Sequence, residues 1–171
     1  MTEIVKGKIE HCELLAKIGV ESFLDSHGKS ASKEDVYSYV NKTFNEKTIL
    51  HELENTDNIY HIIYHKNQIA GYSKIVFNVV NTNIKDQNVT KLERLYLLKE
   101  YYNQNIGAKL FNYNIQLSKE NNQKGIWLAV WVENQRAIDF YTKNGFKIVG
   151  SYDFKISETH SNPNHIMYFK Y

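Results

Sequence analysis

Strands and helices alternate along the second half of this chain, and this order constrains the fold more than any other feature. The hydrophobic pattern predicts strands at Val89–Leu98, Gly125–Val132 and Phe146–Phe154, with helices at Ile106–Asn121 and Asn134–Asn144 between them. A β-α-β-α-β order indicates strands lying side by side in one sheet with helices packed on it. The sequence therefore predicts an α/β fold with a mixed sheet.

One of these strands has the composition of a strand at the centre of the sheet. The run Trp127–Trp131 is apolar at every position and shows no alternation with polar residues. An edge strand, or a strand with one face in water, shows such alternation, whereas a strand covered on both faces does not. We therefore expect helices on both sides of the sheet at this point.

The first half of the chain adds helices and a hairpin. Two β-rich runs, Asn58–Tyr64 and Gln68–Phe77, are separated by three residues and predict an antiparallel hairpin, with its far loop at Asn81–Asn88. Ser32, followed three residues later by Asp35, is typical of a helix start. The other predicted elements are strands at Ile4–Ile9 and His165–Tyr171 and helices at Glu10–Phe23, Lys33–Phe44 and Glu46–Leu53.

Length and composition predict a single domain spanning residues 1–171. The chain has 171 residues, of which 42% are apolar, and this is enough for one hydrophobic core. A single cysteine, Cys12, excludes an internal disulfide framework, and no Cys/His spacing predicts a metal site. We expect a reducing, cytoplasmic setting, and no apolar stretch approaches the roughly 20 residues of a membrane span.

The charge pattern does not favour nucleic acid as a partner. The chain carries 21 basic and 19 acidic residues, giving a formal net charge of +2, and the basic residues are dispersed along it. Most of its 13 tyrosines fall in apolar runs, where core packing is the expected role. The composition therefore does not predict a nucleic-acid-binding protein.

A strand-turn-helix corner between Glu100 and Lys109 has the composition of a phosphate-binding turn. Such a corner directs unpaired backbone N–H groups of the helix start toward one point, where the helix dipole also favours negative charge. Gly107 and Ala108 are small enough to let a phosphate approach the backbone, and Asn105 tolerates a left-handed conformation. A plain turn followed by a helix cap has the same pattern, so this corner alone leaves both interpretations open.

Three segments together resemble the GCN5-related N-acetyltransferases, the GNAT superfamily. They are Leu92-Glu93-Arg94-Leu95-Tyr96-Leu97, the turn before Ile106, and the run from Asn134 to Phe146, which reads NQRAIDFYTKNGF. Within the superfamily the chain is most similar to bacterial spermidine/spermine N-acetyltransferases. The resemblance implies the GNAT acyl-CoA N-acyltransferase fold, a mainly antiparallel sheet with a parallel central splay and flanking helices. It also implies acetyl-CoA as the cofactor.

The resemblance assigns cofactor contacts to all three segments. Backbone of one strand would bind the pantetheine arm, the turn would bind the pyrophosphate, and two residues of the last segment would face the cofactor. The implied residues are Leu95, Tyr96, Leu97, Asn103, Gln104, Asn105, Ile106, Gly107, Ala108, Asn134 and Tyr141. Two positions depart from the family turn, because Tyr102 replaces a glutamine or arginine and Asn105 replaces a glycine.

Acetyl transfer to an amine needs a base, since alkylamines have a pKa near that of lysine, about 10.4, and are protonated at pH 7. By resemblance Glu93 is the base, acting directly or through a water, and an ion pair with a neighbouring cation is the structural alternative. By the same resemblance Tyr141 would protonate the departing thiolate, although spacing alone favours a core tyrosine on an amphipathic helix. The backbone N–H of Leu95 would polarise the acetyl carbonyl.

These assignments predict an N-acetyltransferase acting by direct attack of a primary amine, with a polyamine as the first candidate substrate. Glu21, Asp25 and Glu93 would hold the cationic acceptor, with Glu34 and Asp35 as further acidic candidates. Solvated charges on the helix surface are the alternative interpretation of the four helix residues. Protein or peptide amines and aminoglycoside-type amines are rival substrates. A non-catalytic module that senses acetyl-CoA or a polyamine is the alternative of another class, and a homodimer is compatible with either.

Overall fold

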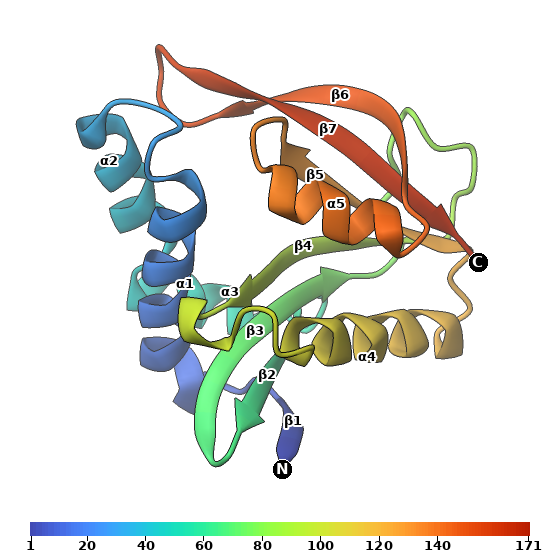
Figure 1. Cartoon of the computed structure of the whole chain (residues 1–171), viewed down its shortest axis with the longest axis horizontal. Helices are drawn as coiled ribbons and strands as arrows, with labels where there is room; N and C mark the ends of the chain where they lie inside the picture. The colour runs from blue at the N-terminus through green and yellow to red at the C-terminus, as the bar shows by residue number, and fades with distance from the viewer.

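A computed structural model describes residues 1–171. Seven strands form one sheet in the order β1-β2-β3-β4-β5-β7-β6, as Figure 1 shows. The strands are β1 (Thr2–Lys6), β2 (Ile59–His65), β3 (Gln68–Val76), β4 (Val89–Leu97), β5 (Gly125–Trp131), β6 (Lys147–Lys155) and β7 (Ser161–Lys170). The helices are α1 (Cys12–His27), α2 (Lys33–Thr43), α3 (Glu46–Glu54), α4 (Ile106–Glu120) and α5 (Gln135–Lys143), with short 3-10 turns η1 (Ile9–His11) and η2 (Lys99–Tyr101).

The sheet opens in its middle, between β4 and β5. These two strands are the only parallel neighbours, and they pair only from Val89 to Lys91 of β4 with Gly125 to Trp127 of β5. Beyond these three pairs the strands diverge, and α5 lies beside the opening (Figure 1). The predicted mixed sheet with a parallel central splay is confirmed, and the splay leaves one edge of β4 without a strand partner.

A β-bulge lies on β4 where the splay begins. Lys74 of β3 pairs with Arg94, whereas the next residue, Ile75, pairs with Leu92. Glu93 is therefore the extra residue of the bulge, opposite no residue of β3. A bulge increases the local twist and redirects a side chain out of the regular alternation, and here it turns β4 away from β5 at Glu93.

Helices cover both faces of the sheet. Ile62 packs into a core cluster with the buried residues of α1, α2 and α3, while its neighbour Ile63 packs with Ile106 and Leu110 of α4. Because adjacent residues of a strand point to opposite faces, α1–α3 and α4 lie on opposite sides of the sheet. Ser32 caps α2 as predicted, its hydroxyl accepting a hydrogen bond from Asp35 N at 3.1 Å.

Several predicted boundaries were wrong at their ends. The first helix continues to His27 rather than ending at Phe23, and the last strand begins at Ser161 rather than at His165. The first strand runs from Thr2 to Lys6, not from Ile4 to Ile9. Apolar periodicity marks the middle of an element better than its ends, where polar residues continue the backbone bonding.

The buried face of α4 differs from the one that helical spacing predicts. Tyr113 follows Ile106 and Leu110 at a spacing that predicts an apolar face, yet it is 40% exposed, while Asn114 and Ser118 are completely buried. Asn114 Nδ2 donates to Ser73 Oγ at 2.9 Å, and the Ser118 and Thr90 hydroxyls lie 2.6 Å apart. Hydrogen bonds to β3 and β4 thus bury polar residues that periodicity places in water. No helix of the chain is long and apolar enough to cross a membrane.

Candidate active site

A cavity of about 940 Å³ occupies the opening between β4 and β5. It is bounded by the C-terminal half of β4, the turn before α4, the start of α5, the end of β5 and residues of α1, α2 and β6. The predicted site residues that line it are Glu93, Leu95, Tyr96, Leu97, Asn103, Asn105, Gly107, Ala108, Asn134 and Tyr141. Ten residues expected at one site are therefore brought together around one space.

The turn before α4 presents a row of free backbone donors. Both Asn103 and Asn105 adopt left-handed conformations, with φ of 60° and 59°. The backbone N–H groups from Asn103 to Ala108 donate no hydrogen bond within the protein, and Lys109 N is the first amide to bond, to Asn105 O at 3.1 Å. Unpaired donors at a helix start are suited to a phosphate. The left-handed conformation of Asn105 also explains why the family has glycine there.

Two predicted members of this turn contribute backbone only. The side chain of Gln104 is exposed and its Nε2 donates to Glu100 O at 2.7 Å, while Ile106 is 1% exposed and packs in the core under α4. A Cβ added at Gly107 would meet only Leu97 Cδ2, at 3.6 Å, which is ordinary contact. The protein's own packing therefore does not require glycine here, and the space over Gly107 is open to a ligand.

Tyr102, the first departure from the family turn, lies between charged residues of two helices. Its hydroxyl donates to Asp25 Oδ2 of α1 at 2.9 Å, and Arg136 Cζ of α5 lies 3.4 Å from the centre of its ring. Lys99 Nζ is 3.4 Å from the other oxygen of Asp25. Tyr102 thus connects the turn to both α1 and α5.

Tyr141 and Asn134 reach the cavity from α5 in different ways. Tyr141 is 8% exposed and packs against Phe111 and Phe146, yet its hydroxyl makes no hydrogen bond with the protein. Burial raises the pKa of Tyr141, so the phenol stays protonated at neutral pH. Asn134 caps the helix, its Oδ1 accepting from Ala137 N at 3.3 Å, so its side chain is partly engaged within the protein.

Glu93, the predicted base, sits in a network of ion pairs. Its Oε1 accepts from Lys74 Nζ at 2.7 Å, and its Oε2 lies 3.5 Å from Lys91 Nζ. Burial opposes the charge, but the attraction and hydrogen bond of Lys74 outweigh it and leave the pKa of Glu93 below its ordinary value. The structural alternative considered for Glu93, an ion pair, is thus present, and the carboxylate faces the cavity at the same time.

A second carboxylate, Glu52 of α3, belongs to the same network but does not line the cavity. Arg94 donates to both oxygens of Glu52, at 2.8 and 3.0 Å, and Lys74 Nζ lies 3.1 Å from Glu52 Oε2. The Tyr60 hydroxyl bonds the same carboxylate. Lys74 and Arg94 are only 4% and 7% exposed, so burial is compensated by pairing. The role of Glu52 was missed because α3 is distant from β4 in the sequence.

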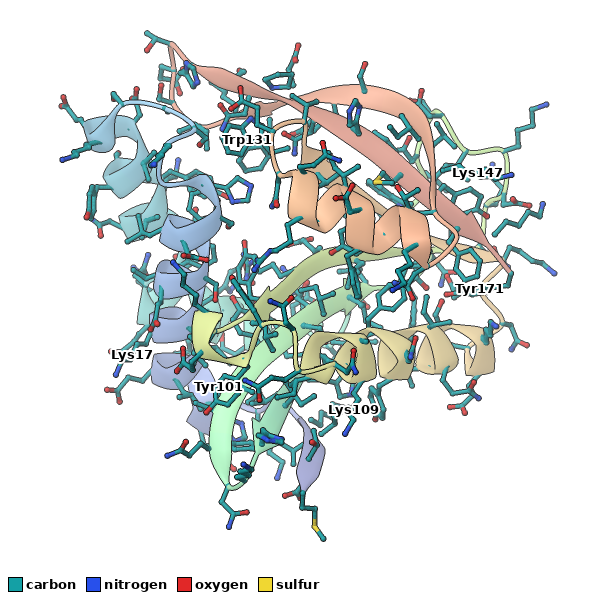
Figure 2. The ribbon with its side chains drawn as sticks, viewed as in Figure 1. Lys17, Tyr101, Lys109, Trp131, Lys147 and Tyr171 are labelled. Atoms are coloured by element: carbon teal, nitrogen blue, oxygen red, sulfur yellow. The ribbon has the colours of Figure 1, made fainter.

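Aromatic rings line the cavity on the side of α1 and β6. Trp131, His27, Phe23, Tyr39, Phe154 and Tyr152 form a chain in that order, with ring centres 5.7, 4.7, 4.9, 5.5 and 6.4 Å apart. Figure 2 shows Trp131 between α1 and α5. Burial lowers the pKa of His27 to about 4, so this aromatic wall is uncharged at neutral pH. Its members come from four elements, and no local sequence pattern predicts them.

Of the acidic residues expected to hold a cation, only Glu93 lines the cavity. Glu21 is exposed on α1, and it is Ser22 and Ser26 that face inward from this helix. The carboxylate of Asp25 is occupied by Tyr102 and Lys99. Glu34 is exposed, Asp35 is half-buried and neither belongs to the lining, so Glu93 is the only acidic residue that lines the cavity.

Comparison with known proteins agrees with this geometry. The family model described as "Acetyltransferase (GNAT) family" matches residues 21–146. An uncharacterized N-acetyltransferase of Lactobacillus delbrueckii subsp. lactis is 28% identical over 141 residues, covering 82% of either chain. The spermidine N(1)-acetyltransferase of Thermoplasma acidophilum is 28% identical over 153 residues, covering 85% of this chain and 88% of its own.

A solved structure matches the whole fold. The PaiA N-acetyltransferase of Thermoplasma acidophilum, in complex with coenzyme A, superimposes with a TM-score of 0.79 at 26% identity, covering 100% of this chain and 99% of the other. This chain has three features that suit a bound coenzyme A. They are the free amides of the turn, the open edge of β4 and the cavity between them. With a family model matched over most of its length, the chain belongs to the GNAT family and is an N-acetyltransferase that uses acetyl-CoA.

Proposed function

We propose that the protein transfers the acetyl group of acetyl-CoA to a small primary amine by direct attack, with Glu93 and Tyr141 as its base and acid. The observation that carries this proposal is that both side chains face one cavity, which also contains the free edge of β4. The open backbone of Leu95, Tyr96 and Leu97 would hold the pantetheine arm as an added strand does. The N–H of Leu95 would bind the developing oxyanion.

Glu93 is best placed to act through a water. A carboxylate already bonded to Lys74 at 2.7 Å has a lowered pKa and little basicity of its own. Its second oxygen, 3.5 Å from Lys91, is less firmly engaged. From there Glu93 would orient a water that accepts the ammonium proton of the acceptor and passes it to the carboxylate, and the neutral amine would then attack the thioester carbonyl. Tyr141, protonated and without a hydrogen-bond partner, would give its proton to the departing sulfur.

A polyamine is the first candidate acceptor. The spermidine N(1)-acetyltransferase at 28% identity supports it, and so does the aromatic wall, because ammonium groups are attracted to the faces of aromatic rings. Ser22 adds a buried hydroxyl that has no partner in the protein and lines the cavity. Glu93 would bind the ammonium group that reacts, and the rings would hold the remainder of the chain.

A monoamine with an aromatic or apolar body is the second candidate. The only carboxylate of the lining, Glu93, is shared between two lysines, and a polyamine carrying several charges benefits from unpaired acidic groups. An uncharged aromatic wall suits an apolar body at least as well. Peptide amines and aminoglycosides are larger acceptors that the same assay can include.

The deciding experiment is acetyl transfer from acetyl-CoA to an amine panel, followed by release of free thiol. The panel pairs spermidine with phenylethylamine and butylamine, and adds a peptide N-terminus and an aminoglycoside. We expect a primary amine to be turned over, with spermidine preferred if the wall binds ammonium groups. Tight acetyl-CoA binding with no thiol release for any amine would instead indicate a sensing module.

A variant of the wall tests its part in acceptor binding. Tyr152 is 49% exposed, so Tyr152→Ala leaves the core intact, whereas the buried Phe23 is part of it. We expect Tyr152→Ala to raise the KM for the acceptor about 3- to 10-fold, consistent with loss of a cation–π or apolar contact of about 1 kcal/mol, and to leave the KM for acetyl-CoA unchanged. An equal rise in the KM values for the acceptor and for acetyl-CoA would show that the aromatic wall is not part of the acceptor site.

A further inference from the structure

The turn before α4 lacks a basic residue at the position where the family has glutamine or arginine, yet a guanidinium lies beside it. Tyr102 occupies that position, and Arg136 Cζ is 3.4 Å from the centre of its ring. Both residues line the same cavity as Asn103, Asn105 and Gly107. We infer that Arg136 of α5 binds the pyrophosphate of coenzyme A, and that Tyr102 is a positioning residue that holds its guanidinium over the turn.

The other cations near the turn are directed elsewhere. Lys109, on the first turn of α4, lies on the side of the helix away from α5 (Figure 2), and its Nζ is 3.4 Å from Thr2 Oγ1 on β1. Lys99 is paired with Asp25 at 3.4 Å. Arg136 is exposed and forms no salt bridge. It is therefore the cation beside the turn whose charge the protein has not already neutralised.

The contact with Tyr102 holds the guanidinium over the face of the ring. A guanidinium that lies flat on an aromatic face keeps the N–H groups at its rim free, and these match the oxygen spacing of a phosphate. The Tyr102 ring is in turn fixed by its hydrogen bond to Asp25 Oδ2 at 2.9 Å. Asp25, expected to bind the substrate, instead anchors the residue that positions this cation.

The arrangement places positive charge on both lips of the cavity. One lip is the turn, with its free amides from Asn103 to Ala108, and the other is the start of α5. A pyrophosphate between them would receive backbone donors from one side and the guanidinium from the other. The basic side chain that the turn lacks is thus supplied by a helix more than thirty residues later in the chain.

Calorimetry with three probes tests the assignment, and it depends on the coenzyme A site rather than on the identity of the acceptor. The probes are coenzyme A, dephospho-coenzyme A, which keeps the pyrophosphate but lacks the 3′-phosphate, and pantetheine, which lacks both. We expect Arg136→Gln to weaken coenzyme A and dephospho-coenzyme A equally, by about 10-fold, and to leave pantetheine unaffected. Lys17→Ala removes an exposed charge of α1 distant from the cavity and should change none of the three affinities.

Variants of Tyr102 separate positioning from fold. Tyr102→Phe keeps the ring and should retain affinity within about twofold, whereas Tyr102→Leu removes the stacking face and should lose part of the same affinity as Arg136→Gln. In the double variant Tyr102→Leu/Arg136→Gln the losses should not add, because both remove one interaction. Unchanged coenzyme A affinity in Arg136→Gln, an equal loss for pantetheine, or a loss that vanishes with dephospho-coenzyme A would each overturn the assignment.

Discussion

The cofactor side and the acceptor side of the cavity differ in how far their polar groups are already engaged. On the cofactor side, the amides from Asn103 to Ala108 and the hydroxyl of Tyr141 have no partner in the protein. On the acceptor side, Glu93 is bonded to Lys74 and Lys91, and behind it Glu52 is bonded to Arg94. The first set is open to a ligand, and the second is largely satisfied within the chain.

This difference explains why the structure supports the cofactor more strongly than the acceptor. Free donors gathered at one turn indicate an anionic ligand, since each buried or half-buried donor gains by being paired. A satisfied network indicates no particular ligand, because each of its charged groups already has a partner of opposite charge. Selectivity on the acceptor side must therefore come from the shape of the aromatic wall, from Ser22 and from the one less engaged oxygen of Glu93.

The largest effect we predict concerns Glu52, which belongs to the satisfied network and does not line the cavity. Glu52→Gln leaves Arg94, 7% exposed, without its carboxylate. Loss of one partner of a buried ion pair costs about 3–5 kcal/mol, and we expect this loss in the free energy of unfolding, measured with urea at pH 7. Retention of full stability would show that the network is not a structural unit.

The pH dependence of this loss has a definite sign. Despite burial, which opposes the charge, Arg94 and Tyr60 hold the pKa of Glu52 below its ordinary value. The stabilisation is therefore present above the unfolded-state pKa of about 4.3 and lost as pH falls through the lower folded-state pKa. The stability difference between wild type and Glu52→Gln should shrink below about pH 4.

Tyr141→Phe should produce the largest loss of activity on the cofactor side. The change removes only a hydroxyl that makes no hydrogen bond in the protein, so the fold should be preserved. Loss of a general acid typically costs 10²- to 10⁴-fold in rate, and we expect kcat to fall by about 10²-fold or more while coenzyme A still binds. Because burial raises the pKa of Tyr141, the wild-type rate should not decline between pH 7 and 10. An unchanged kcat would exclude Tyr141 as the acid.

Glu93→Gln tests whether Glu93, although paired with two lysines, also acts as the base of the reaction. In this variant Lys74 retains its ion pair with Glu52, whose Oε2 is 3.1 Å from Lys74 Nζ. The free energy of unfolding should therefore fall by about 1 kcal/mol, well below the loss expected for Glu52→Gln. We expect kcat/KM for the amine to fall by about 10²-fold. Since the pKa of Glu93 is lowered, its carboxylate is ionised around neutral pH, so kcat/KM in the wild type should change little there, whereas in the variant it should rise with pH as the free amine deprotonates. An unaltered rate would leave Glu93 a purely structural partner of Lys74.

More of the residues predicted for the cofactor than of those predicted for the acceptor line the cavity, and the reason is physical. Leu97, Asn105 and Gly107 lie in short segments whose order along the chain is also their order in space, so the local sequence is enough to predict that β4 and its turn lie together. Lys74, Glu52 and Trp131 meet only after β3, α3 and β5 have packed, and their pairing depends on tertiary distances of a few ångströms. The bulge that turns Glu93 toward Lys74 likewise has no signature in the residue pattern.

Two residues that were predicted by charge alone do not line the cavity. Glu21 and Asp25 were chosen because acidic groups attract a cation, but an α-helix directs only part of its surface inward, and here that part carries Ser22 and Ser26. Asp25 reaches Tyr102 instead. Net charge and composition therefore limit the class of ligand without identifying the side chains that meet it.

The smallest effect we predict asks whether the open cofactor side depends on backbone or on side chains. Asn105 has a left-handed backbone conformation, with φ of 59°, and its side chain makes no capping hydrogen bond. Asn105→Gly should therefore change the free energy of unfolding by less than about 0.5 kcal/mol. Glycine removes the conformational cost of this φ, but it loses more chain entropy on folding. Asn105→Ala should cost about 1 kcal/mol, since alanine tolerates this conformation poorly. If backbone amides alone bind the phosphate, the Kd of coenzyme A for Asn105→Gly should change less than about threefold. A tenfold loss would show that the asparagine side chain itself contacts the cofactor, and that this turn has replaced the family's glycine with a ligand.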